Sequence, residues 1–461
     1  MQVKMNGNVS FWYADLGGLP KKRPGLPGDR QADICIIGAG YTGLWTAYYL
    51  KKTNPSLSIV IVEREFAGFG GAGRNGGWLS GGFDWSREKY LKGSSRQAVI
   101  AMQRAMAGTV DEVIRIAALE GIDADILRAD NLVVATNVAQ MERLIDDHKT
   151  MLDWEVPAEK IGLLSAHEAA ERVCVAGVRG GLVTRGMARV QPAKLARGLA
   201  KAVERLGVTI YEGTAVTGYR NGVVETDLGN VRAPVILRAT EGFTAGLKGH
   251  EREWLPLNSA QIVTEPLPDA LWDEIGWRGH ELLSEGAHAY CYAQRTREGR
   301  IAMGGRGVPY RFGSRTDVNG QTQDATIAQL QAILFRLFPQ VKGIGIDHAW
   351  CGVLGVPRDW CTTAGFDVAS GIGWAGGYVG LGVSSSNLAG RTLTDLVLKR
   401  DTELVRLPWV NRSVSRWEPE PLRWLGVHTM YQLYRLADER EAQGLGRTSR
   451  LARFADKLTG H

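Results

Sequence analysis

The sequence predicts an α/β fold: a domain built on parallel βαβ units, an interleaved β-rich α+β domain and a helical C-terminal tail. A short β-branched run at 32–37 leads through a glycine-rich turn into a helical pattern over 42–52, and a second apolar run follows at 58–63. Alternating patterns typical of antiparallel strands dominate 254–306. Helical patterns return beyond residue 399. These observations indicate two domains and a tail.

Composition narrows the class of protein. The chain has 461 residues, 44% of them hydrophobic, which is enough for a large core in two or three domains. Its five cysteines are an odd number without a C-x-x-C pair, so we expect neither a disulfide framework nor a metal site, and a cytoplasmic location. The net charge of +6 is scattered, which argues against a nucleic-acid surface. The apolar stretch 34–50 contains three glycines and is too short for a membrane span.

The turn after the first predicted strand reads G-A-G-Y-T-G, a G-x-G-x-x-G fingerprint of Rossmann-type domains. Its glycines permit a tight turn, close approach of a pyrophosphate and close packing of helix on strand. The helix N-terminus then offers N–H groups to the anion, and an acid about 20 residues further on can bind a ribose hydroxyl. The residues expected to bind the dinucleotide here are Gly38, Gly40, Tyr41, Thr42, Gly43, Glu63 and Arg64.

A second glycine cluster, at 69–77, comes directly after the ribose-binding acid. It is too flexible for a helix, and a loop with so few side chains can lie along an extended cofactor. The residues expected to contact the cofactor are Gly71, Ala72, Arg74, Asn75, Gly76 and Gly77.

The chain resembles the FAD-dependent D-amino-acid oxidase (DAO) superfamily, and within it the gamma-glutamylputrescine oxidase-like branch. The resemblance covers most of the chain and follows the family's order. The motifs that carry it are FWY at 11–13, ADICIIGAGYTGL at 32–44, GFGGAGRNGG at 68–77, ATEGFT at 239–244, GRIAMGG at 299–305 and GGYVGLGV at 376–383.

This resemblance implies FAD as the cofactor and a Rossmann-type FAD-binding domain of the DAO type. It places the adenine against the backbone of Val216 and the flavin's pyrimidine end at the 376–383 loop. A helix starting near Ser386 would direct its dipole at the flavin N1–C2=O region. The further cofactor-binding residues that it implies are Val216, Thr240, Gly377, Tyr378, Val379, Gly380, Leu381 and Gly382.

The domain arrangement that follows is discontinuous. The helical patterns at 96–122 and 139–151 belong to neither strand nor fingerprint, and they indicate an inserted helical part of the second domain. The predicted segments are 1–90, 181–250 and 345–400 for the FAD-binding domain, 91–180 and 251–344 for the substrate domain, and 401–461 for the C-terminal helical extension.

The sequence also departs from its relatives. Leu381 stands where members of the branch often carry a histidine. Sarcosine-oxidase-like members place a lysine over the flavin to assist reaction with O₂, and 299–305 contains none, although Arg295 and Arg306 flank this segment. Cys351 lies near the position where some sarcosine oxidases attach flavin, and we expect it to be a free, structural thiol.

The predicted activity is oxidation of the C–N bond of a primary or secondary amine or amino acid, by hydride transfer to flavin N5 and hydrolysis of the imine, with O₂ as acceptor and H₂O₂ as product. One alternative is a D-amino-acid or N-substituted-glycine dehydrogenase using another electron acceptor. Another is an FAD-binding subunit or RNA-modifying flavoprotein. Two histidines, His288 and His348, are more typical of structural roles than of bases. Aromatic side chains expected to wall the substrate pocket are Trp78, Tyr290, Tyr292, Trp350 and Trp374.

Overall fold

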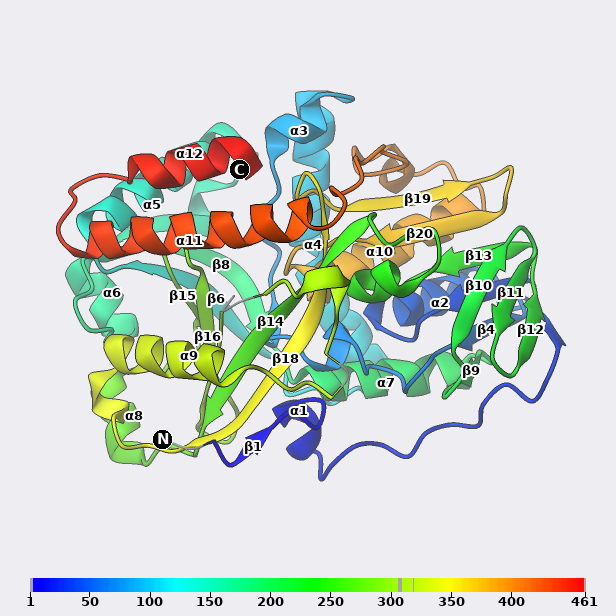
Figure 1. Cartoon of the computed structure of the whole chain (residues 1–461), viewed down its shortest axis with the longest axis horizontal. Coiled ribbons are helices and arrows are strands. Elements are labelled where there is room, and N and C mark those ends of the chain that lie inside the picture. Colours follow the sequence, from blue (N-terminus) through cyan, green and yellow to red (C-terminus); the bar gives the residue numbers. More distant parts are fainter. Residues whose placement is uncertain (1–2, 306–308, 318, 460–461) are drawn as a thin grey trace.

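The computed structural model describes residues 3–305, 309–317 and 319–459 and consists of two large sheets with their helices (Figure 1). A six-stranded sheet lies in one half and a ten-stranded sheet in the other, with a separate four-stranded sheet at the edge of the first half. Arg306, one of the two arginines that flank the segment 299–305, lies outside the described residues.

The six-stranded sheet has the order β19-β20-β13-β3-β4-β9, and its pairs are parallel except for β19 with β20. Two neighbouring strands of its interior read ICII and IVIV and are buried throughout, because helices cover both faces of such a sheet. The strands are β3 (Ile34–Ile37), β4 (Ile59–Val62), β9 (Thr209–Tyr211), β13 (Val235–Arg238), β19 (Thr363–Asp367) and β20 (Ile372–Gly376).

Three helices pack on this sheet: α2 (Tyr41–Thr53), α7 (Pro192–Arg205) and α10 (Gly382–Val397). The βαβ unit of β3, α2 and β4 occurs where the sequence predicts it. At Gly390 a Cβ atom would lie 2.8 Å from the Trp45 backbone, so glycine allows α10 to approach α2 closely. Helix α2 follows β3 and α10 follows β20. Because both strands run parallel to β13, the two helices begin at the same end of the sheet.

The ten-stranded sheet has the order β1-β18-β14-β17-β16-β15-β6-β8-β5, with β7 paired to β8. Its longest pairing joins β14 to β18 in antiparallel register along the centre of the molecule. The strands are β1 (Met5–Asn6), β5 (Trp78–Leu79), β6 (Leu127–Ala135), β7 (Ile161–Ser165), β8 (Gly180–Arg189), β14 (Trp254–Thr264), β15 (Leu282–Glu285), β16 (Cys291–Arg295), β17 (Ile301–Gly305) and β18 (Ile346–Pro357). The remaining helices of the first 400 residues are α1 (Phe11–Ala14), α3 (Arg87–Leu91), α4 (Arg96–Leu119), α5 (Val138–Asp153), α6 (Ala166–Arg172), α8 (Asp269–Ile275) and α9 (Asp324–Leu337).

The segment that carries the two predicted helices also contributes strands to the large sheet. Helices α4 and α5 are present, but β6 lies between them and β7 and β8 follow, all within the large sheet. β6 pairs in parallel with β15, a strand about 150 residues further along the chain, so only the tertiary structure shows its partner. The four-stranded sheet consists of β10 (Val216–Arg220), β11 (Val223–Thr226), β12 (Gly229–Arg232) and β2 (Arg30–Gln31).

The boundaries of the two domains stay a prediction. The segment 345–400, assigned from the sequence to the FAD-binding domain, begins with β18, which pairs with β14 in the large sheet. No helix in the described part of the chain is long and apolar enough to cross a membrane.

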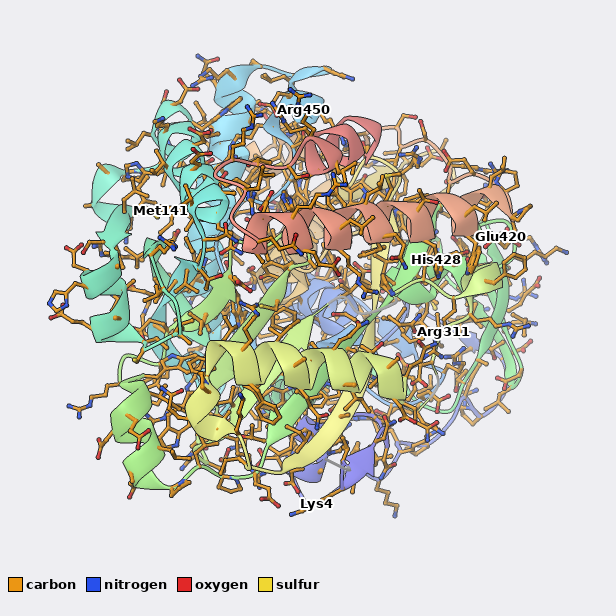
Figure 2. All side chains as sticks on the ribbon, turned by 60° about the vertical axis from the view of Figure 1, so that its left-hand side comes forward. Lys4, Met141, Arg311, Glu420, His428 and Arg450 are labelled. Carbon is orange, nitrogen blue, oxygen red and sulfur yellow. The ribbon has the colours of Figure 1, made fainter. Side chains whose placement is uncertain are left out.

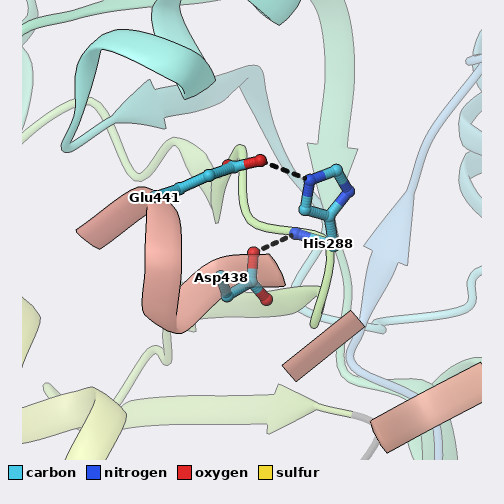
Figure 3. A group of neighbouring side chains, drawn as sticks. All are labelled: His288, Asp438 and Glu441. Carbon is cyan, nitrogen blue, oxygen red and sulfur yellow. Dashed lines mark hydrogen bonds and ion pairs between the residues drawn. The ribbon is translucent and has the colours of Figure 1, made fainter. Parts of the chain in front are cut away.

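The C-terminal tail forms two helices, α11 (Leu422–Ala442) and α12 (Arg450–Thr459), which lie side by side over the half that contains the large sheet (Figure 1). Figure 3 shows how α11 is held. The Asp438 carboxylate accepts the backbone N–H groups of His288 and Ala289 at 2.9 and 2.7 Å, and His288 Nε2 lies 3.0 Å from Glu441 Oε1. These contacts fix α11 to the chain that leads into β16.

The cluster of His288, Asp438 and Glu441 has the composition of a metal site. However, Glu441 also pairs with Arg143 at 2.9 Å and accepts the Ser449 N–H at 2.8 Å. Because its carboxylates already have N–H partners and a guanidinium stands beside them, the cluster is better suited to holding α11 in place than to binding a cation.

Candidate functional site

A cleft of about 1280 Å³, counting its open mouth, lies at the carboxyl ends of β3, β4 and β13. Ligands of open α/β sheets bind at this edge. Fourteen of the residues predicted to bind the cofactor line the cleft: Gly38, Gly40, Tyr41, Thr42, Glu63, Arg64, Gly71, Ala72, Asn75, Val216, Thr240, Tyr378, Gly380 and Gly382.

The N-terminus of α2 faces the cleft and carries the features of an anion site. Its N-cap is Gly40, no side chain caps it, and its first turn has no acidic residue. A Cβ atom on Gly40 would meet nothing within 4 Å, so there is open space where a diphosphate would lie. Gly38 has φ +104°, and a Cβ on Gly43 would lie 2.1 Å from the Gly38 carbonyl oxygen, so the tight turn requires both glycines.

Glu63 is fixed at the end of β4 by the backbone. Its carboxylate accepts the N–H groups of Ala39 and Glu65, both at 2.9 Å. Burial raises the pKa of this carboxyl group, and the two N–H donors oppose that rise. The acid therefore lines the cleft and is joined to the fingerprint turn through the Ala39 N–H.

The glycine loop at 69–77 is held by the N-terminal lead of the chain. Trp12 Nε1 donates to the Asn75 carbonyl oxygen and the Ser10 hydroxyl donates to that of Gly73, both at 2.7 Å. The Asn75 amide in turn donates to the Ala72 carbonyl oxygen at 2.9 Å. This explains why an aromatic run so far from the loop in sequence belongs to the same motif set.

Three residues of this loop do not line the cleft. Arg74 is fully buried beneath the loop, where its Nε donates to the Phe69 carbonyl oxygen at 2.7 Å. Gly76 and Gly77 leave room for β16 side chains: a Cβ on Gly76 would lie 2.4 Å from the Tyr292 ring, and one on Gly77 would lie 2.1 Å from the Gln294 amide. We attribute these three residues to packing rather than to cofactor contact. Gly43 likewise serves helix packing and is not among the residues that line the cleft.

Sequence reasoning missed Glu241, an acid that lines the cleft just after β13. Its carboxylate accepts the N–H of Tyr378 at 2.9 Å and the N–H of Gly355. Glu241 therefore connects the loop after β20 to strand β18. Burial raises the pKa of Glu241 to about 7, although the backbone N–H donors act to lower it. The only sequence signal for this residue is its position in the ATEGFT motif.

The loop at 376–383 closes the other end of the cleft. The Tyr378 hydroxyl lies 2.7 Å from Thr42 Oγ1, which links this loop to the fingerprint helix. Helix α10 begins at Gly382, four residues before the predicted position, and no side chain caps it. A second helix N-terminus thus faces the cleft. Three predicted residues of this loop, Gly377, Val379 and Leu381, do not line the main cleft.

The predicted aromatic residues separate into two groups. Trp78, Tyr290 and Tyr292 lie together, with ring centroids 5.8 Å apart for Trp78–Tyr292 and 5.7 Å for Tyr290–Tyr292. Trp350 is fully buried and donates to the Arg74 carbonyl oxygen at 3.0 Å, which makes it part of the core under the glycine loop. Trp374 lies on β20, paired with β13 and β19, and does not line the cleft. None of the five aromatic residues lines the cleft, and only Trp78, Tyr290 and Tyr292 lie together as a group.

The two histidines considered as bases and Cys351 also lie outside the cleft. His348 is buried with Nε2 2.7 Å from the Gly7 carbonyl oxygen, and His288 contacts α11, so both have structural surroundings. Cys351 is buried and donates to the Gln321 carbonyl oxygen at 3.3 Å, and burial raises the pKa of its thiol to about 12. A thiol so difficult to ionise is poorly suited to bond a flavin.

The fold and the cleft define a dinucleotide-binding protein of the flavoprotein type. The sequence profile of the FAD dependent oxidoreductase (DAO) family matches residues 33–396, and the chain belongs to this family. It is therefore an FAD-dependent oxidoreductase. The two uncapped helix ends, the open space at Gly40 and the backbone-held acids fit this cofactor.

Known relatives agree with this assignment. The chain is 29% identical over 407 residues to the gamma-glutamylputrescine oxidoreductase of Escherichia coli, covering 87% of this chain and 91% of that protein. It is 27% identical over 399 residues to a probable oxidoreductase, OrdL, of Rhizobium meliloti, covering 83% and 86%. Among solved structures, its fold is similar to that of L-proline dehydrogenase from P. horikoshii, with TM-score 0.69 and 18% identity over 82% of this chain and 96% of that one. Glycine oxidase from Geobacillus kaustophilus gives TM-score 0.67 and 20% identity over 83% and 100%.

Proposed function

We propose that the enzyme oxidises the C–N bond of a primary or secondary amine or amino acid. The carbon bearing the amine loses a hydride and the nitrogen loses a proton, which leaves an imine; water then converts the imine to a carbonyl compound and releases the nitrogen product. When bound, FAD supplies the hydride acceptor at N5. We propose O₂ as the final acceptor, with H₂O₂ as its product.

The observation that carries this proposal is the aromatic group at the inner end of the glycine loop. The Tyr292 ring lies 2.4 Å from the position that a Cβ atom on Gly76 would take. Trp78 is the first residue after the glycine loop, and its ring contacts that of Tyr292. Large aromatic side chains exclude water and contact the substrate at low entropic cost. We propose that Trp78, Tyr290 and Tyr292 orient the C–H bond of the substrate.

We also propose roles for the residues that line the cleft. The α2 N-terminus, with Gly38 and Gly40, would hold the diphosphate, and Glu63 the ribose of the adenosine half. Val216 also lines the cleft, and we propose that its backbone contacts the adenine. The N-terminus of α10 would face the flavin's pyrimidine end and stabilise negative charge there.

Anaerobic mixing with single amines and amino acids tests the activity. At least one compound should bleach the flavin absorbance, and subsequent admission of air should yield one H₂O₂ per carbonyl formed. Bleaching without peroxide would indicate a dehydrogenase that uses another acceptor. If no compound bleaches the flavin, the proposed activity is wrong, and salt-sensitive retention of RNA would then favour the RNA-modifying alternative.

Trp78→Phe, with Trp374→Phe as the matched control, tests the wall. We expect kcat/KM to fall about tenfold or more in Trp78→Phe and to stay within twofold in the control. Equal effects of both substitutions would contradict the proposed position of the substrate.

A further inference from the structure

A second, smaller cavity adjoins the inner end of the cleft. Leu354 lines both, and Val379, between the cleft residues Tyr378 and Gly380, forms part of the wall of the smaller one. Ser259 lines it as well, and its hydroxyl lies 3.4 Å from that of Tyr292 in the aromatic group. The small cavity is therefore placed between the flavin end of the cleft and the proposed substrate wall.

No charged side chain lines this cavity among the residues that the structure describes. Its other walls include Leu257, Val356 and Trp360, and the polar side-chain groups among the described lining residues are the Ser259 hydroxyl and the Trp360 indole N–H. Among the described residues, Arg358, which is two residues from the lining residues Val356 and Trp360, lies 3.0 Å from Glu418, and Arg412 pairs with Asp359, so both guanidinium groups already have carboxylate partners. A carboxylate brought into such a cavity would lose its hydration without gaining a cationic partner from the described lining residues.

Two wall residues hold conformations that favour glycine. Val379 has φ +55° and Trp360 has φ +59°. For a β-branched residue this region is a strong outlier, and such strain persists only where the surrounding structure imposes it. Glycine at 379 would relieve the strain but would remove part of the wall, so the structure retains an apolar side chain at this point.

The C-terminal extension forms the outer side of the same apolar cluster. Trp424 and Val427 of α11 pack against the cluster that contains Leu257 and Val356. Trp417 Nε1 donates to the Val356 carbonyl oxygen at 2.7 Å.

The position of α11 is visible in Figure 2, which shows it crossing the molecule from Glu420 at its beginning past His428. The helix lies beyond residue 396, where the match to the family profile ends.

From these observations we propose that the small cavity receives the carbon substituent of the substrate, and that the substrate is an amine with a short apolar substituent and no carboxylate. This inference rests on the proposed C–N oxidation and narrows its substrate class. The small size of the cavity limits the length of the substituent, and α11 packs on the apolar cluster that contains its wall residues Leu257 and Val356.

Matched pairs of amino acids and their decarboxylated amines test the class: alanine with ethylamine, valine with isobutylamine, and phenylalanine with phenethylamine. Flavin reduction is followed anaerobically in the holoenzyme. We expect the amine of a pair to exceed its amino acid at least 100-fold in kcat/KM. A preference for the amino acids would overturn the inference while leaving C–N oxidation intact, and loss of that preference in Arg306→Ala would identify a carboxylate-binding cation outside the described residues. Absence of reduction by every member would contradict both proposals.

The wall is tested with a series from n-propylamine to n-hexylamine. Leu257→Ala should raise kcat/KM for the longer amines relative to the shorter at least tenfold, because each methylene in an apolar pocket is worth about tenfold or more. Leu255→Ala is the matched control, since Leu255 is buried on the same strand in the same cluster but does not line the cavity.

Val379→Gly provides a second variant that does not depend on tolerance of a truncated core. It should retain FAD, unfold at the same or a higher temperature and show the same shift toward longer amines. An unchanged length preference in both Leu257→Ala and Val379→Gly would overturn the assignment of this cavity.

Discussion

At the scale of single residues, Gly40 shows how an absent side chain can define a site. It precedes α2, lines the cleft, and a Cβ there would contact no protein atom. Gly40→Val should therefore fold normally but bind FAD at least tenfold more weakly, a loss of about 1.4 kcal/mol, because the side chain enters the space of the diphosphate. FAD content and the dissociation constant measure this. Gly108→Val, an exposed position in α4 that also has open space, should retain FAD. Full FAD content in Gly40→Val would contradict the site.

Glu241 makes a prediction about pH. Its pKa is raised to about 7, so the folded protein retains a proton that the unfolded chain releases near pH 4.5. The residue consequently costs stability as pH rises from about 4.5 to 7. In apoprotein, the free energy of unfolding of Glu241→Gln relative to the wild type should increase by on the order of 2 kcal/mol across this interval, since water in the open cleft screens part of the full effect. The acceptor lost in the variant adds an offset that does not depend on pH. If the free energies of unfolding of the wild type and Glu241→Gln change in parallel from about pH 4.5 to 7, the pKa of Glu241 is not raised.

At the scale of elements, α11 depends on a buried charge pair. Burial alone would raise the pKa of Glu441, but hydrogen bonds from His288 and the Ser449 N–H, together with the Arg143 charge, lower it to about 2. The carboxylate therefore stabilises the fold above about pH 4.5, and this contribution is lost as pH falls toward 2.

Glu441→Gln should loosen the C-terminal helices, because it leaves Arg143 without its counter-charge at a buried position. We expect a loss of about 3 kcal/mol in local stability. Amide hydrogen exchange in 422–459 should accelerate about 100-fold while that of α2 is unchanged. Glu439→Gln, an exposed change on the same helix, is the control and should have no effect. Equal exchange in the two variants would show that the pair does not hold α11.

At the scale of the whole molecule, the distribution of cations predicts slow use of oxygen. Among the residues that the structure describes around the cleft, the lining contains no lysine. Arg295 lies over the Trp272 ring at 4.1 Å and donates to the Trp277 carbonyl oxygen, and Arg300 pairs with Asp347 at 2.7 Å. The third cation of β16 and the turn after it, Arg297, pairs with Asp125 at 2.6 Å, so none of the three is available to stabilise superoxide at the flavin.

Stopped-flow mixing of the reduced enzyme with O₂ measures the consequence. A missing fixed charge of 3–4 kcal/mol slows the step about 100- to 1000-fold, so reoxidation should be slower than reduction by substrate. Arg295→Ala should leave the rate unchanged. A rate equal to that of efficient flavin oxidases would contradict the argument for the described residues, and its loss in Arg306→Ala would assign the effect to that arginine.

The sequence by itself determined the parts of this protein that local chemistry specifies. The βαβ unit, the turn with Gly38, Gly40 and Gly43, and the acid Glu63 follow from spacing along one continuous segment, where glycine conformation and strand periodicity leave few alternatives. The helices α4 and α5 were also predictable, because their apolar residues repeat with the helical period.

The tertiary structure decided what depends on contacts between distant segments. β6 and β15 pair across about 150 residues, Gly76 is a glycine because Tyr292 approaches it, and Trp350 belongs to the core because its indole meets the Arg74 carbonyl oxygen. The raised pKa of Glu241 and the cavity between Leu354 and Val379 also arise only after folding. Burial, strain and cavity shape are properties of the packed chain, and a linear sequence carries no direct record of which side chain will fill which space.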